Sequence, residues 1–416
     1  MRNILKSKIL VIGGGPAGMM SALQASEKSS GVVLVEKNDR LGLKLLITGK
    51  GRCNITNAET EVRSLVQKFG KNGKFLYSSL NKFSVDDVVS FFQQNGLKTK
   101  TERGGRIFPV SNNSADVLAV LVNKMKKNNV KIVNNDPVVN VIKNGKMIEK
   151  VVLKSGREVV AEKFIICTGG KSYPATGSTG DGYRWLKNLG HNLVKPEPVL
   201  VPIMVKENFV KELEGLSLKN VAIKVFQKNK KQDERFGEAI FTNNGMSGPI
   251  ILDLSKSIGS LLQAGKVELR IDFKPGLSVA ELDARIQRDF KGLINKDFKN
   301  SLDDLLPQKL IPVVVKLSNI DKNTKVNSIT REERKVLVKL LKEFVLEVDR
   351  LDGFEKAIVT KGGVDLREID PQTMKSKIIE NLYFAGEILD LDGPTGGYNL
   401  QVCWSTGFVA GNSVLD

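Results

Sequence analysis

Three glycines near the N-terminus have the spacing of a phosphate-binding turn. Gly13, Gly15 and Gly18 fit the pattern GxGxxG, between a short apolar run and an Ala/Met/Leu-rich stretch, and Pro16 and Ala17 lie inside the pattern. The first glycine allows a tight turn, the second lets the backbone approach a pyrophosphate, and the third lets helix and strand pack closely. A helix N-terminus favours anions through its free N–H groups and its dipole. The pattern predicts a dinucleotide-binding site.

An acidic residue stands at the end of the next predicted strand, 31–36. Glu36 follows Gly18 by 18 positions and is placed to accept hydrogen bonds from the hydroxyls of an adenosine ribose, and Lys37 comes directly after it. Because strand, turn, helix and spaced acid occur together, a dinucleotide site is favoured over an ordinary glycine turn. This fingerprint alone does not distinguish NAD from FAD.

Three later features of the sequence favour FAD over NAD. Residues 138–167 have β-rich runs separated by tight hairpin signals, which predicts a three-stranded meander where a simple NAD dehydrogenase has a helical crossover. A second glycine turn follows this meander, and a third glycine-rich segment opens a final apolar stretch, 400–411. The candidate cofactor-contacting residues in these segments are Thr168, Gly169, Gly170, Gly386, Glu387, Gly396, Gly397, Tyr398, Asn399 and Leu400.

Several long motifs resemble one family. The N-terminal fingerprint, GRCNITN at 51–57, GRIFP at 105–109 and AGEILDLDGPTGGYNLQ at 385–401 look like the bacterial flavoproteins known as aminoacetone-oxidase-like proteins or NAD(FAD)-utilising dehydrogenases. The resemblance covers essentially the whole chain. It implies an α/β, two-dinucleotide-binding-domain flavoprotein fold, with a Rossmann-like FAD domain containing a β-meander and an inserted β-barrel and helical subdomain. It also implies bound FAD, and either amine oxidation or NAD(P)H-dependent reduction of unsaturated substrates.

The resemblance assigns roles near the C-terminus. Glu387 looks like the acid that meets the ribitol chain of FAD, and residues 396–399 would bring the N-terminus of the last helix against the flavin pyrimidine edge. Reduced flavin carries negative charge at that edge, so the helix dipole would stabilise it.

The resemblance also implies that Gly51, Arg52, Cys53 and Asn54 line the isoalloxazine, and the last three are candidate catalytic residues. Disulfide reductases of the wider fold carry a Cys-x4-Cys pair near this place, whereas only Cys53 stands here. Cys53 is therefore either a packing residue beside the flavin or a reactive thiol. Arg52 either holds a substrate carboxylate or pairs with a carboxylate such as Asp390.

A few further polar residues bear on the chemistry. His191 is the single histidine and follows a helix-ending glycine, so we expect a cap or surface residue. Asn243 stands where the resembled family usually has histidine, and an amide orients by hydrogen bonding but is no general base. We expect Asp181 to cap a helix over 182–189. Arg106 either reaches the active-site cavity or is solvated.

Composition indicates an ordinary globular protein of 416 residues, 41% hydrophobic and 26% charged. Three widely spaced cysteines exclude a disulfide framework and fit a reducing cytoplasm, and no apolar run is long enough to span a membrane. The net charge of +18 divides into +6 over residues 200–350 and +12 elsewhere. This even spread favours a small-molecule substrate over nucleic acid, with a flavin-containing tRNA-modifying or tRNA-binding protein as the alternative. Nothing in the sequence indicates an oligomeric state.

The motifs also predict the domain organisation and the route of electrons. We expect residues 1–197 and 355–416 to form the FAD-binding domain and 198–354 an inserted domain. Within the insertion the resemblance implies a barrel-like part at 198–273 and 344–354 and a helical part at 274–343. No second GxGxxG occurs in residues 190–380. Either the substrate reduces the flavin directly, or NAD(P)H binds transiently as reductant without a domain of its own.

Overall fold

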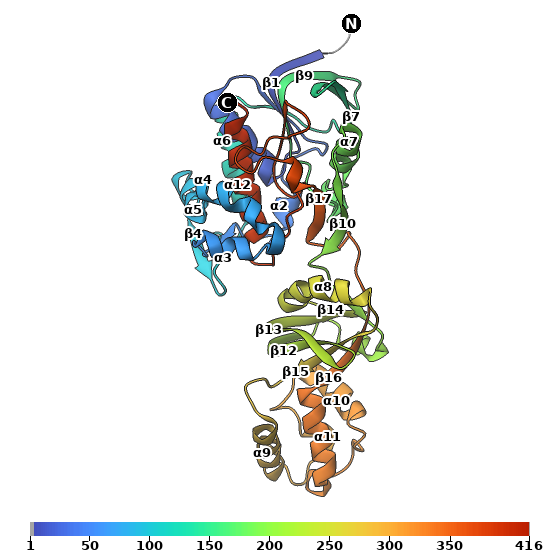
Figure 1. The fold of residues 1–416 in the computed structure, drawn as a ribbon. Helices are drawn as coiled ribbons and strands as arrows, with labels where there is room; N and C mark the ends of the chain where they lie inside the picture. The colour runs from blue at the N-terminus through green and yellow to red at the C-terminus, as the bar shows by residue number, and fades with distance from the viewer. Residues whose placement is uncertain (1–3, 416) are drawn as a thin grey trace. The chain divides into compact units, whose positions relative to one another are not determined.

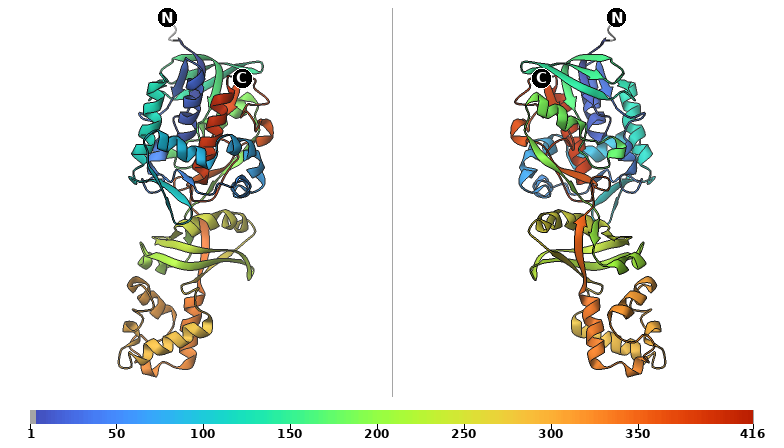
Figure 2. Two further views of the ribbon diagram at one scale, coloured as in Figure 1. Left: turned by 90° about the vertical axis from the view of Figure 1, so that its left-hand side faces the viewer. Right: turned by 90° about the vertical axis from the view of Figure 1, so that its right-hand side faces the viewer.

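The computed structural model describes residues 4–415, and the chain divides into two units. The first unit comprises Met1–Pro198 and Ala357–Asp416, and the second comprises Val199–Lys356. Each has its own buried hydrophobic core. In Figures 1 and 2 both ends of the chain, blue and red, belong to the first unit. The first unit is therefore assembled from segments at opposite ends of the sequence.

The first unit is built on a mixed sheet with the strand order β6-β2-β1-β9-β8-β7. β1 (Ile4–Ile12) pairs in parallel with β2 (Val32–Val35) and with β9 (Glu158–Ile166). β6 (Lys131–Val133) extends the sheet beyond β2, and β18 (Leu382–Phe384) pairs in parallel with β9. Every residue of β2 is buried, as expected for a parallel strand covered on both faces.

The meander predicted at 138–167 is confirmed. β7 (Val138–Asn144), β8 (Met147–Leu153) and β9 pair antiparallel in succession. Gly145 and Gly156 take positive φ, +59° and +81°, in the two tight turns. Since β9 then pairs in parallel with β1, the meander returns the chain to the strand that precedes the glycine turn.

The last helix packs on the first. α1 (Pro16–Lys28) and α12 (Tyr398–Ser413) lie side by side, in blue and red in Figure 1. A Cβ at Gly407 would lie 2.6 Å from the carbonyl oxygen of Ala17, and one at Gly411 would lie 2.4 Å from that of Ser21. Only glycine allows this close approach, so the two chain ends form one packed body.

The remaining elements of the first unit surround the sheet or extend from it. They include a three-stranded sheet in the order β3-β5-β4 and a two-stranded sheet, β10-β17. Their bounds are α2 (Leu43–Ile47), β3 (Thr56–Asn57), α3 (Val62–Gln67), α4 (Tyr77–Lys82), α5 (Val85–Gln94), β4 (Thr99–Glu102), β5 (Arg106–Pro109), α6 (Ser114–Lys127), α7 (Asp181–Leu189), β10 (Leu193–Val199) and β17 (Val359–Val364).

The second unit contains a closed barrel in the order β11-β14-β13-β12-β15-β16. Inward residues such as Val225, Leu269 and Leu346 are fully buried. The strands are β11 (Ile203–Val205), β12 (Ser217–Gln227), β13 (Lys230–Thr242), β14 (Gly245–Ser247), β15 (Val267–Asp272) and β16 (Phe344–Leu351), and the helices are α8 (Pro249–Leu262), α9 (Val279–Lys291), α10 (Ile311–Leu317) and α11 (Arg331–Lys342). α9 and α11 open with capping boxes at Ser278 and Thr330.

Within residues 4–415, no helix has the length and apolar character needed to cross a lipid bilayer.

Candidate functional site

The turn between β1 and α1 has the geometry of a phosphate-binding loop. Gly13 has φ +107°, and a Cβ there would lie 2.5 Å from the carbonyl oxygen of Cys167. A Cβ at Gly18 would lie 1.8 Å from the carbonyl oxygen of Gly13. Gly15 differs, because its φ is −78° and a Cβ there would meet no atom of residues 4–415 within 4 Å. Gly15 therefore borders open space at the N-terminus of α1, beside Pro16.

Glu36 is buried directly against this turn. Its Oε2 accepts the backbone N–H of Gly14 at 2.7 Å, and its Oε1 accepts the backbone N–H and side-chain amide of Asn38. The structure thus places the predicted ribose-binding acid beside the predicted pyrophosphate-binding turn. The next residue, Lys37, donates from Nζ to Asp181 Oδ2 at 2.6 Å and to Thr179 Oγ1 at 2.7 Å.

The prediction that Asp181 caps α7 is wrong. The N-cap is Gly180, in a left-handed conformation with φ +81°, and Asp181 is the first helical residue. Burial opposes ionisation of Asp181, but hydrogen bonds from Lys37 and Thr179 outweigh it and lower the pKa of the carboxyl. Asp181 ties the 177–182 loop to the end of β2.

The second glycine turn, at 168–170, adjoins the first. The carbonyl oxygen of Cys167 faces Gly13, and Thr168 follows it with a buried Oγ1 that has no partner within residues 4–415. Gly169 has φ +70°. A Cβ at Gly170 would lie 2.4 Å from Thr360 Oγ1, so the turn is closely packed.

The Gly386-Glu387 segment reaches the same place from the other end of the chain. Gly386 has φ +79°, and a Cβ there would lie 2.7 Å from that of Ala17, inside the N-terminal fingerprint. Glu387 Oε1 would lie 3.2 Å from a Cβ at Gly170. The three predicted glycine segments therefore converge, although more than 350 residues separate the first from the last.

Glu387 is held in a polar network. Its Oε2 accepts from Lys44 Nζ at 2.7 Å, and its Oε1 accepts from Ser172 Oγ at 2.7 Å and from the backbone N–H of Thr360 at 2.8 Å. Lys44 Nζ also donates to Ser172 Oγ at 2.6 Å. Sequence reasoning missed Lys44. Its signal was a lone lysine within the apolar run 43–47.

The loop containing Arg52, Cys53 and Asn54 has unusual backbone geometry. Lys50 and Cys53 have φ +59° and +60°, and Gly51 has φ +81°. For residues other than glycine such conformations are costly and tend to cluster at functional sites. Cys53 is fully buried, and burial raises the pKa of its thiol to about 12 against a lowering hydrogen bond with Thr48. A buried, protonated thiol is a poor nucleophile, which favours a packing role.

Arg52 pairs with a carboxylate that the sequence did not indicate. Its Nη1 donates to Glu102 Oε1 at 2.9 Å, and its guanidinium lies 4.0 Å above the centre of the Phe108 ring. The hydrogen bond from Arg52 lowers the pKa of Glu102. The suggested pairing with Asp390 is wrong, because Asp390 instead accepts from Asn72 Nδ2 at 2.8 Å and from a backbone N–H.

Arg106 is the half-buried first residue of β5, and its Nε donates to the carbonyl oxygen of Arg103 in the β4–β5 turn at 3.0 Å.

The N-terminus of α12 is preceded by a rigid glycine loop. Gly396 and Gly397 have φ +114° and +101°, and a Cβ at Gly397 would lie 2.5 Å from the carbonyl oxygen of Thr56. Asn57 Nδ2 donates to the carbonyl oxygen of Gly396 at 3.0 Å. The loop is thus fixed against the GRCNITN segment.

One of the predicted residues that follow this loop stabilises it by hydrogen bonds. Asn399 Oδ1 accepts the N–H of Gly393 at 2.8 Å, and its Nδ2 donates to the carbonyl oxygens of Gly393 and Pro394. Asn399 therefore holds the loop with its whole amide. Tyr398 opens α12, and Leu400 is half-buried in its first turn.

His191 is buried, so it is not a surface residue. The expectation of a cap is met by its backbone N–H, which donates to the carbonyl oxygen of Leu186 at the end of α7 at 2.9 Å. Its Nδ1 lies 3.0 Å from Glu368 Oε2, and its Nε2 lies 3.1 Å from Ser376 Oγ. Ser376, His191 and Glu368 are connected by hydrogen bonds in the same way as the triad of a serine hydrolase. However, Ser376 is only 5% exposed, and its hydroxyl also accepts the N–H groups of Ile378 and Ile379. These three side chains therefore join two loops. Burial lowers the pKa of the His191 imidazole.

Asn243 lies in the second unit, exposed at the turn between β13 and β14.

The first unit fits a dinucleotide. Buried polar side chains of native proteins usually have partners, yet within residues 4–415 Asn54 Oδ1, Thr168 Oγ1 and Tyr183 Oη have none. They belong to the segments that the sequence assigned to the cofactor or, for Tyr183, to the helix that follows the 177–182 loop. Together with the open side of Gly15, they indicate polar groups that a ligand satisfies.

Comparison with known proteins supports the same conclusion. The family model described as "HI0933-like protein Rossmann domain" matches residues 7–413. The chain is similar to the 3-dehydro-bile acid delta(4,6)-reductase of Clostridium scindens, with 30% identity over 99% of both chains. It is also similar to the ribosomal RNA dihydrouridine synthase of Escherichia coli, with 27% identity over 98% of this chain and 97% of that protein. Among solved structures, 3-ketosteroid-delta4-(5alpha)-dehydrogenase from Rhodococcus jostii shares the fold, with a TM-score of 0.53, 13% identity and coverage of 99% and 97%.

Proposed function

The chain belongs to the HI0933-like Rossmann family, and we propose that it is an FAD-dependent reductase of a carbon–carbon double bond conjugated to a carbonyl group. That it is an FAD-dependent oxidoreductase rests on this family and on its curated relatives. The observation that carries the proposal is the convergence of the 13–18 turn, Glu36 and Glu387 in one unit.

We propose reduction of a conjugated double bond because the names of two relatives imply substrates with the same chemistry. A 3-dehydro bile acid with delta(4,6) unsaturation carries double bonds conjugated to its 3-oxo group. A dihydrouridine synthase saturates the double bond of uracil that is conjugated to the C4 carbonyl. In both cases the carbonyl makes the far carbon of the double bond electrophilic, so one hydride-transfer site serves both substrate classes.

The residues of the first unit would hold FAD along its length. The N-terminus of α1 would face the pyrophosphate at Gly15, where free N–H groups favour anions. Glu36 would accept hydrogen bonds from the adenosine ribose, and Glu387, held by Lys44, would accept them from the ribitol. A bound FAD would supply hydride transfer at N5.

Other residues would shape the reaction environment. The free N–H groups and the dipole at the N-terminus of α12 would favour negative charge at the flavin pyrimidine edge. Arg52, ordered by Glu102, would help to position the substrate, while Cys53 would pack without a thiol relay. NAD(P)H would bind transiently as reductant, since residues 190–380 contain no second GxGxxG.

A second candidate substrate is a uridine in structured RNA. Two observations favour it: the net charge of +18 and the relatives named ribosomal RNA dihydrouridine synthase. Polyphosphate ligands are attracted by such a surplus at modest salt.

An anaerobic titration tests the proposal. The FAD-loaded protein is mixed in turn with NADH, NADPH and amines such as aminoacetone while the oxidised-flavin band is followed. The reduced protein is then mixed with a conjugated enone or a uridine-containing RNA. We expect a nicotinamide to reduce the flavin, and an enone or RNA to reoxidise it with formation of the saturated product. Bleaching by an amine alone, with no reoxidation by either acceptor, would show an amine oxidase instead.

A further inference from the structure

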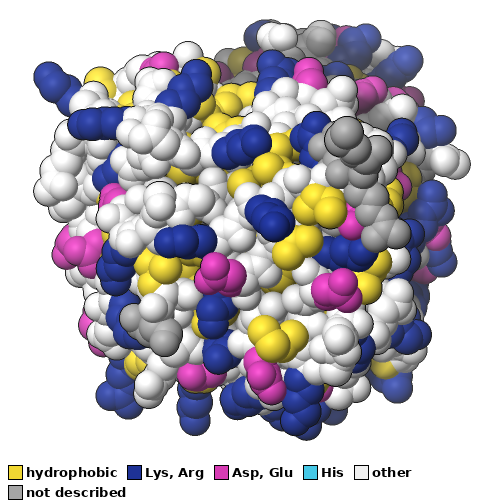
Figure 3. Space-filling model, turned by 90° about the horizontal axis from the view of Figure 1, so that it is seen from above, with side chains coloured by type: hydrophobic (Ala, Val, Ile, Leu, Met, Phe, Trp, Pro, Cys, Tyr) yellow, Lys and Arg dark blue, Asp and Glu magenta, His cyan; other side chains and the backbone are white. Residues whose placement is uncertain are grey.

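A large share of the positive charge lies in one short segment of the first unit. Figure 3 shows Lys and Arg side chains scattered over one face, in agreement with an even surplus on the scale of whole units. On a finer scale, residues 95–131 hold eight Lys or Arg and two acidic residues, a net charge of +6 out of the chain's +18. This segment comprises the loop after α5, the β4–β5 hairpin and α6, so its charge is carried by consecutive elements.

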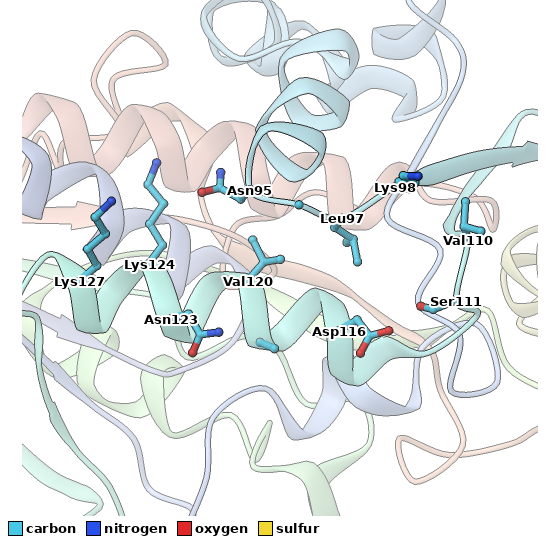
Figure 4. A pocket seen from close by; sticks show the side chains of 12 residues that line it. Asn95, Leu97, Lys98, Val110, Ser111, Asp116, Val120, Asn123, Lys124 and Lys127 are labelled. Carbon is cyan, nitrogen blue, oxygen red and sulfur yellow. The ribbon is translucent and has the colours of Figure 1, made fainter.

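An open groove of about 590 Å³ runs along this segment. Figure 4 shows it between α6 and the chain that leaves α5, with Lys124 and Lys127 toward one end and Lys98 and Val110 toward the other. Its floor contains apolar groups, including Leu97, while Val110 is 51% exposed at the rim.

The groove offers unpaired cations. Lys98 and Lys127 are exposed and have no side-chain partner within residues 4–415, whereas Lys124 pairs with Glu27 at 3.0 Å. Asp116 is the one carboxylate of the lining. At the Lys98 end the β4–β5 hairpin adds Arg103, which is also exposed and has no side-chain partner in the described chain. The free charge is therefore positive at both ends.

The helix that lines the groove packs at one end on the candidate cofactor site. At the N-terminal end of α6, the N–H of Ser114 donates to the carbonyl oxygen of Gly51 at 2.9 Å, and its Oγ donates to that of Leu46 at 2.7 Å. This end of α6 thus packs on the loop that holds Arg52, Cys53 and Asn54. From Ser114 to Lys127 the helix rises roughly 20 Å at 1.5 Å per residue.

We propose that this groove binds a strand of RNA and guides it to the candidate cofactor site. A strand with one phosphate per ~3.4 Å would place roughly six phosphates along ~20 Å of α6. Lys98, Arg103 and Lys127 would contact phosphates, and the apolar floor with Val110 would accept base or ribose surface. A base at the end of the groove leaves its stack to be modified, as enzymes that act on bases require. The inference rests on the second candidate substrate above.

Binding of a fluorescently labelled RNA hairpin to the full FAD-loaded chain tests the inference, with anisotropy measured over a range of salt concentrations. The variant Lys98→Gln/Lys127→Gln is compared with Lys154→Gln/Lys187→Gln, which removes the same charge from two exposed lysines outside the groove. Loss of two contacts to single-strand phosphates lowers the slope of log K against log salt concentration by about 1.4. At 0.1 M salt this corresponds to an association constant roughly 25-fold lower. We expect this loss in the groove variant and less than a twofold change in the control.

Three results would overturn the inference: no RNA binding at low salt, equal losses in the two variants, or equally tight binding of poly-glutamate with the same dependence on Lys98 and Lys127. Flavin content, thermal unfolding and enone reduction are measured on the same samples. Because neither lysine belongs to the cofactor site, these properties stay unchanged in both variants. A failure of RNA binding thus leaves the proposed reductase standing, while a failure of flavin reduction does not explain lost RNA binding.

Discussion

Substituting Gly15 by alanine separates cofactor binding from folding. At this position φ is −78°, which alanine adopts without strain, and a Cβ would meet no described atom within 4 Å. The free energy of unfolding of the FAD-free protein should therefore change by no more than about 0.5 kcal/mol. In the holoprotein the added methyl group would occupy space that the pyrophosphate needs.

The size of the affinity loss follows from the contacts at the N-terminus of α1. A hydrogen bond to a charged group contributes about 1.5–3 kcal/mol, and displacement of the phosphate from one N–H group removes that amount. FAD should then bind roughly 10–100-fold more weakly to Gly15→Ala. Fluorescence titration of the FAD-free protein measures this, and urea unfolding of the same sample measures stability.

Gly18→Ala is the matched control. Its Cβ would lie 1.8 Å from the carbonyl oxygen of Gly13, so helix and strand must separate, and overpacking of this kind costs about 1–3 kcal/mol. We expect Gly18→Ala to destabilise the FAD-free protein and Gly15→Ala not to. If Gly15→Ala binds FAD like the wild type, or destabilises as much as Gly18→Ala, the assignment of the turn is refuted.

Three further substitutions test other parts of the site. Glu387→Gln removes the partner of Lys44 and the proposed ribitol acceptor, so FAD affinity should fall about tenfold; an unchanged dissociation constant would contradict that role. Cys53→Ser should keep kcat within about threefold, and a thiol reagent should leave Cys53 unmodified at neutral pH, because burial raises the pKa of this thiol to about 12; loss of turnover with normal flavin content would indicate a reactive thiol. His191→Gln tests pH dependence: burial lowers the pKa of folded His191, so its contribution to stability is present above its unfolded pKa of about 6.5 and is lost as pH falls toward the folded pKa. Urea unfolding between pH 7.5 and 5 should show a shallower decline for this variant, and an equal decline would exclude His191 as the source.

Local signals predicted the fold well. The turn residues Gly13 and Gly18 and the hairpin glycines Gly145 and Gly156 each act within a few residues, so their effect is readable from the sequence. The α/β class follows from the order of such elements, whereas the inserted barrel was implied by the resemblance to a known family.

The partners of charged side chains were harder to predict, because they come from distant segments. Arg52 pairs with Glu102 across 50 positions, and His191 with Glu368 across 177. Lys44 reaches Glu387 across 343 positions. Nothing in the periodicity around these residues indicates such pairs, because the tertiary fold brings the partners together from separate elements.

The most direct test of the central claim is a single-turnover experiment without oxygen. The FAD-loaded protein is reduced by one equivalent of electron pairs and mixed with a conjugated enone, and both the oxidised-flavin band and the product are measured. The account predicts one saturated product for each flavin reoxidised, in the wild type, and neither signal in protein that retains no FAD. Reduced flavin that stays bleached with every enone and with uridine-containing RNA, and recovers only when oxygen is admitted, would contradict it.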